Sequence, residues 1–111
     1  MLMGREDEMA TSRKTEQCPV AETAKILSRK WVFLILRDLS EGKQRFSDLQ
    51  RSLGVSPRVL STRLDELEEE GVLIRTCFAE VPPRVEYALT EKGQALIPVI
   101  EEMRAFGRRL I

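Results

Sequence analysis

The region from residue 45 to residue 89 constrains the fold most, because it combines two short helices and two short strands in a fixed order. Residues 45–53 form a short amphipathic segment, and Gly54 marks a tight turn after it. A second helix opens at Ser56 with polar and basic residues on its outer face. Two short strands with a Pro-Pro turn follow. A helix, a turn, a helix and a β-ribbon in this order predict a winged helix-turn-helix, a fold of the α+β class.

The second helix of this region carries clear start and end signals. Ser56 is a preferred N-cap residue, Pro57 suits the first helical position, and Gly71 ends the helix. Its buried face is predicted to consist of Leu60, Leu64 and Leu67. Residues 73–79 and 84–89 are expected to be strands. Prolines suit the loop between them and keep the ribbon edge from recruiting another strand.

Further helices are expected on both sides of this region. Cys18 caps a first helix that begins with a proline, and Gly42 ends a second helix in which Trp31 is a core anchor. Thr90 caps a last helix, which Pro98 should bend. Large apolar residues recur along this last helix at the spacing of a two-helix seam, namely Leu96, Val99, Met103, Phe106 and Leu110.

The apolar seam predicts a homodimer, because five large apolar side chains on a surface helix are too many for a soluble monomer. The first helix, from Val20 onward, is expected to pack across the seam. The chain length fits one compact domain, here residues 18–111. Residues 1–17 have mixed charge and no apolar core, so we expect a flexible arm rather than a signal peptide.

Charge is segregated along the chain although the formal net charge is zero. Residues 28–63 hold eight Lys or Arg and three acids, whereas residues 65–70 hold five acids and no base. Local fields rather than the total govern docking, so a basic surface for nucleic acid remains available. No apolar run approaches the length of a membrane span, and a cytoplasmic location without a membrane partner is expected.

Several kinds of chemistry are excluded by composition. The chain has no histidine, so Ser-His and Cys-His nucleophile pairs are impossible. Two cysteines without histidine do not make a usual structural zinc site, and there is no Gly-rich phosphate loop. The acids of residues 65–70 are expected to be a solvated helix face. We therefore predict neither an enzyme nor a metal or cofactor site.

The polar face of the second helix favours double-stranded DNA as the partner. A helix N-terminus attracts phosphate, Arg58 near that end can reach a guanine edge, and Ser61 and Thr62 can touch bases or phosphates. Arg45 and Arg63 are expected to contact phosphates, which position the protein. The full set expected at DNA is Arg45, Ser47, Ser56, Arg58, Ser61, Thr62, Arg63 and Arg84. The alternative is a winged-helix module that binds another protein and no DNA.

Several motifs together resemble those of the HxlR family of bacterial transcriptional regulators. They are Cys18-Pro19-Val20, Lys30-Trp31, Arg45-Phe46, Leu60-Ser61-Thr62-Arg63-Leu64, residues 67–71 and the run from Val81 to Gly93. The resemblance implies a homodimer that regulates transcription on a palindromic operator. Two residues depart from the family pattern, since Arg29 stands where the family usually has glycine and Phe106 where it often has tryptophan.

The cysteine before the first proline could be a sensor. Some regulators similar to this family sense oxidants or electrophiles through it, so the resemblance implies this role for Cys18. The positive end of a helix favours a thiolate, which is the reactive form. The alternative is a half-buried capping residue without a signalling role. Cys77 lies in a predicted strand, where alternation allows either a core or a surface position.

Overall fold

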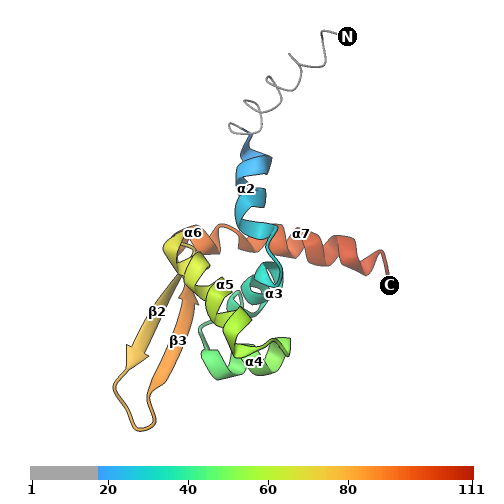
Figure 1. The fold of residues 1–111 in the computed structure, drawn as a ribbon. Helices are drawn as coiled ribbons and strands as arrows, with labels where there is room; N and C mark the ends of the chain where they lie inside the picture. Colours follow the sequence, from blue (N-terminus) through green and yellow to red (C-terminus); the bar gives the residue numbers. More distant parts are fainter. Residues whose placement is uncertain (1–17) are drawn as a thin grey trace, which may run out of the picture.

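The computed structural model describes residues 18–111, so the arm expected at residues 1–17 lies outside the described residues. Helices and a small sheet follow one another along this part of the chain (Figure 1). In order they are α2 (Pro19–Leu27), α3 (Val32–Leu39), β1 (Gln44–Arg45), α4 (Phe46–Leu53), α5 (Pro57–Glu69), β2 (Leu73–Phe78), β3 (Arg84–Leu89), α6 (Glu91–Gln94) and α7 (Ile97–Arg108). The predicted winged helix-turn-helix of the α+β class is confirmed.

The helix-turn-helix consists of α4, a turn and α5. Gly54 caps α4 in the left-handed conformation, at φ 64°, where a side chain would be strained. Ser56 caps α5 as predicted, because its Oγ accepts a hydrogen bond from the Val59 amide at 3.3 Å. Leu60, Leu64 and Leu67 are fully buried. The leucine stripe therefore fixes which face of α5 remains outside.

The wing is larger than the predicted two-stranded ribbon. The sheet has three antiparallel strands in the order β1-β3-β2. In β1, Gln44 pairs with Tyr87 and Arg45 with Glu86. Two residues are too few to display the alternation that predicts a strand, so β1 had no signal in the sequence. The predicted strand at residues 73–79 ends one residue earlier than expected.

The core lies between α3, α4, α5 and the sheet. Val32, Ile35 and Leu36 of α3 are fully buried against it. Trp31 packs on this core as expected. It does not lie inside the second helix, however, but at the N-cap position before α3, with φ 79°. Such a left-handed conformation is uncommon for a bulky residue, and it marks a sharp junction between α2 and α3.

The C-terminal region contains two helices where one was predicted. Thr90 caps α6, as expected, but α6 ends at Gln94 and α7 begins at Ile97. Pro98 explains the break, since it has no N–H to offer the carbonyl of Gln94 and its ring would clash there. The proline instead occupies the first turn of α7, which suits it. Figure 1 shows α2 and α7 projecting away from the end of the molecule that carries α4 and the wing.

Candidate nucleic-acid interface

The outer face of α5 is polar and open. Arg58, Ser61 and Thr62 are all exposed. The Thr62 hydroxyl donates to the Arg58 carbonyl at 3.0 Å, which holds its oxygen against the helix. Within residues 18–111, the guanidinium of Arg58 has neither an ion pair nor a hydrogen bond. A charged, unpaired side chain near a helix N-terminus is available to an external anion or base edge.

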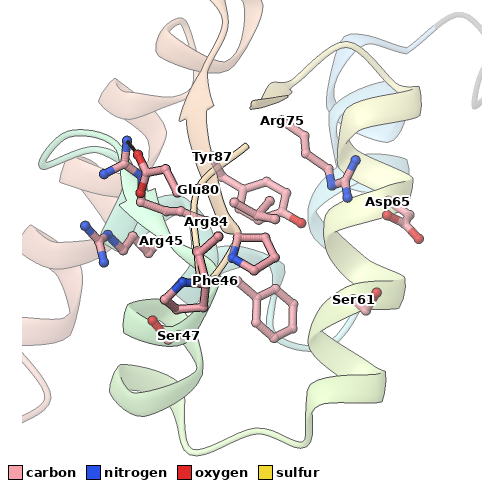
Figure 2. Close-up of a pocket in the computed structure, with 13 residues that line it drawn as sticks. Arg45, Phe46, Ser47, Ser61, Asp65, Arg75, Glu80, Arg84 and Tyr87 are labelled. Carbon is pink, nitrogen blue, oxygen red and sulfur yellow. Dashed lines mark ion pairs between the residues drawn. The ribbon is translucent and has the colours of Figure 1, made fainter. Parts of the chain in front are cut away.

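A cleft of about 690 Å³ separates α5 from the wing. Ser61 and Asp65 line it from α5, Arg75 from β2, and Arg45 and Ser47 from the β1–α4 junction. In Figure 2, Arg75 extends from the wing toward α5. Phe46, Pro82 and Pro83 also line the cleft. The cleft thus brings three arginines to the side of α5, namely Arg45 of β1, Arg75 of β2 and Arg84 of β3.

Arg75 is a cleft residue that sequence reasoning missed. A hydrogen bond from its side chain to Tyr87 raises the pKa of Arg75 above its ordinary value, and burial raises the pKa of the Tyr87 phenol. Both shifts favour the forms already present near pH 7, a charged guanidinium and a neutral phenol. The positive charge on this side of the cleft is therefore constant across the physiological range. Its place in strand β2 carried no signal that distinguished it from an ordinary exposed arginine.

Two of the arginines expected at DNA are engaged within the chain. The Nη2 of Arg84 lies 3.1 Å from Glu80, its Nε lies 3.3 Å from Glu86, and its guanidinium stacks on the Phe78 ring at 4.1 Å from the centroid. The Arg63 Nε donates to a backbone carbonyl at 3.0 Å. Both side chains are three-quarters buried, so the geometry favours structural roles for them over free phosphate contacts.

Three other predicted contact residues differ in whether their polar side-chain groups already have a partner within the described part of the chain. Arg45 and Ser47 are exposed at the mouth of the cleft, and Arg45 has no ion pair among the described residues. Ser56 is exposed as well, but its Oγ already accepts the capping hydrogen bond. The interface that remains open to a ligand is therefore centred on Arg58 and extends to Arg45.

The two cysteines occupy different environments. Cys18 is half-buried at the N-cap of α2, and its side chain makes no capping hydrogen bond, so the expected position is confirmed but the capping role is not. Cys77 is exposed in β2, which settles the choice between core and surface. No cluster of metal ligands occurs within residues 18–111.

The predicted seam residues are largely exposed on the single chain. Val20, Val99, Met103, Phe106 and Leu110 are open to solvent, and Phe106 is 60% exposed. Leu96 differs, because it packs against the core of its own chain. An apolar cleft of about 140 Å³ between α3 and α7 adjoins the seam and is lined in part by Phe33, Leu34 and Met103. None of the helices between residues 18 and 111 has the length and apolar character needed to cross a membrane.

Comparison with known proteins agrees with this architecture. The pattern of the HxlR-like helix-turn-helix matches residues 26–111. The uncharacterised HTH-type transcriptional regulator YvaP of Bacillus subtilis is 50% identical over 100 residues, which are 88% of this chain and 93% of YvaP. Both the family and this relative are transcriptional regulators rather than enzymes.

Two solved structures have the same fold. The redox regulator HypR in its oxidised form has 35% identity and a TM-score of 0.77, covering 83% of this chain and 96% of HypR. The reduced form of the transcriptional regulator YodB of B. subtilis has 38% identity and a TM-score of 0.69, covering 80% and 89%. The chain thus belongs to the HxlR-like helix-turn-helix family of transcriptional regulators.

Proposed function

We propose that the protein binds a palindromic DNA operator as a homodimer, with α5 in the major groove. The observation that carries this proposal is the exposed face formed by Arg58, Ser61 and Thr62 beside an open cleft. The phosphate backbone would follow the cleft, where Arg45 and Arg75 supply positive charge. Such a regulator works where chromosomal DNA lies, so we also propose a cytoplasmic location.

The apolar α7 supports the dimer. A protomer with Val99, Met103 and Phe106 exposed along α7, and Leu110 exposed just beyond its end, offers a surface that a second copy can bury. Two-fold symmetry brings two α5 helices to one face of the dimer. The two half-sites would then have centres roughly 10 base pairs, or a multiple of this, apart.

Replacing Arg58 with alanine should weaken operator binding by about 1–3 kcal/mol and relax the preference at one base position. The reason is that an arginine makes two hydrogen bonds to a guanine edge, which no other base offers in the same geometry. Operators would be selected from a pool of random duplexes, and affinities measured by fluorescence anisotropy on the selected site and on its point variants.

Arg45→Ala is the matched control, since it removes one exposed arginine that we assign to a phosphate. It should weaken binding to all sequences about equally and reduce the salt slope by about 1. An Arg58→Ala variant with unchanged base preference would contradict the assignment. Failure of the wild-type protein to select any site would instead favour the alternative, a winged-helix module for a protein partner.

We also propose that oxidants or electrophiles control DNA binding through Cys18. The half-buried thiol lies at the N-terminus of α2, and the similar proteins include one described as a redox regulator. With hydrogen peroxide, the thiolate sulfur would attack one oxygen and the O–O bond would break. The sulfur would become a sulfenic acid, and hydroxide would be the leaving group. With diamide, Cys18 and the partner's Cys18 would form a disulfide and pass two electrons and two protons to the reagent.

Oxidation should change operator affinity reversibly in the wild-type protein and leave Cys18→Ser unaffected. Either product adds polarity or a covalent restraint close to α2, and a small change in subunit angle would mismatch both half-sites. Gel-shift titrations with peroxide and diamide, followed by reductant, would measure the change. Cys77→Ser is the control and should respond like the wild type. An identical response of Cys18→Ser and wild type would leave Cys18 without a sensing role.

A further inference from the structure

A cluster of charged side chains joins the junction between α2 and α3 to the C-terminal half of α5. The Nη2 of Arg29 lies 2.6 Å from Glu70 Oε1 and also donates to the Ile26 carbonyl at 3.1 Å. Its Nη1 lies 3.2 Å from Glu66 Oε1. One guanidinium therefore binds two carboxylates of α5 and the last turn of α2 at once.

A second arginine closes the cluster from the side of α5. The Nη1 of Arg63 lies 3.1 Å from the same Glu66 oxygen, and its Nε donates to the Lys30 carbonyl at 3.0 Å. The four side chains of Arg29, Arg63, Glu66 and Glu70, with the Lys30 carbonyl, are called the α5 clamp below. Arg29 reaches from the α2–α3 junction to α5, and Arg63 reaches from α5 back to that junction. These opposed contacts restrict sliding and rotation of α5.

The clamp is unlike an ordinary surface ion pair. The side chain of Arg29 is only 23% exposed, and its Nε is buried without a hydrogen-bond partner. A guanidinium is suited to this place because its planar fork can satisfy several acceptors in fixed directions, which an ammonium group cannot. Arg29 is also one of the two residues at which this chain departs from the family pattern noted above.

We infer that Arg29 is a positioning residue that sets the orientation of the recognition helix α5 relative to α2. The inference rests on the proposed function, since it treats α5 as the helix that reads DNA. Leucines bury one face of α5 but allow small rotations, because apolar contacts have little directional preference. The clamp supplies direction, and it links α5 to the helix that carries Cys18 and Val20. A displacement of α2 would therefore move α5.

The test compares Arg29→Lys with Glu70→Gln and with their double variant. Arg29→Lys keeps the net charge but cannot bridge both carboxylates, so operator affinity should fall roughly 3- to 30-fold. Affinity for non-specific DNA and the salt slope should stay at the wild-type values, because no phosphate contact is lost. The double variant should lose less than the sum of the single losses, since both remove the same contact.

Lys25→Ala is the control for breaking an exposed ion pair, because the pair of Lys25 with Glu22 on α2 lies outside the clamp. It should retain operator affinity. Thermal unfolding of each variant would ensure that all measurements are made on folded protein. A loss that is equal for operator and non-specific DNA, or wild-type operator affinity in Arg29→Lys, would overturn the inference.

A measurement without DNA separates this inference from the proposed function. In the free protein, Arg29→Lys should shift the backbone amide resonances of residues 58–62, which lie at the far end of α5, and speed hydrogen exchange at residues 66–70. Unchanged resonances at residues 58–62 would overturn the positioning role, whether or not the protein binds DNA. Shifted resonances in a protein that selects no operator would uphold the clamp and reject the proposed function instead.

Discussion

Replacing Gly93 with alanine is expected to lower the free energy of unfolding by about 3–5 kcal/mol. A Cβ atom at this position would lie 2.1 Å from the Val72 carbonyl oxygen and 3.2 Å from the Cβ of Leu89. The oxygen belongs to backbone that is already held, because the Thr90 amide donates to it at 3.0 Å. Neither the backbone at Val72 nor the backbone of α6 can move aside alone, so α6 would have to separate from the start of β2.

Chemical denaturation followed by circular dichroism would measure this loss. Gly107→Ala is the matched control, since a Cβ there meets no atom within 4 Å in the protomer. Alanine is the better helix former, so this control should be neutral or stabilising by up to about 1 kcal/mol. If Gly93→Ala unfolds at the same denaturant concentration as the wild type, the close approach of α6 to Val72 does not exist in solution.

The helix-turn-helix was predictable because its signals are local. Ser56 and Pro57 mark the start of α5, and leucines at helical spacing mark its buried face. The hairpin of β2 and β3 was predictable to within one residue, at the end of β2, because alternation and prolines are visible in a short window. The short strand β1 was not predictable in this way. The boundary between α6 and α7 could not be predicted from a local pattern, because Pro98 can either bend a helix or lie in the first turn of a new one.

The candidate site was predictable as a face but not residue by residue. Exposed Arg58 follows from the stripe on α5, whereas the engagement of Arg63 depends on a carbonyl 33 residues away. The partners of Arg84 are close in sequence, but they meet it only once the wing hairpin has formed, because Glu80 lies in the wing loop and Phe78 on the opposite strand. Sequence patterns report which side of an element faces outward. They do not report which charges will find partners when distant elements meet.

Replacing Phe106 with glutamate is expected to convert the proposed dimer to monomers and to reduce operator affinity at least about 100-fold. The side chain lies mid-seam on α7 and is 60% exposed in the protomer, so the proposed partner would cover it. A carboxylate buried in an apolar interface without a partner is strongly unfavourable. A monomer would then bind one half-site and lose the gain in effective concentration that the second α5 provides. Sedimentation velocity at micromolar concentration would report the mass, and anisotropy the affinity.

Ala105→Glu is the control that separates burial from charge. It introduces the same carboxylate on the same helix, one position away and on a side that faces away from Met103 and the rest of the seam. This variant should remain a dimer and keep operator affinity within about threefold, because surface changes of this kind alter free energies little. Both variants change the net charge equally, so a difference between them reports the seam position itself, where the aromatic ring of Phe106 is lost and a carboxylate takes its place. Two dimers that bind alike would mean that the seam is not the interface, and a wild-type monomer that still selects a palindrome would mean that the two subunits meet only on DNA.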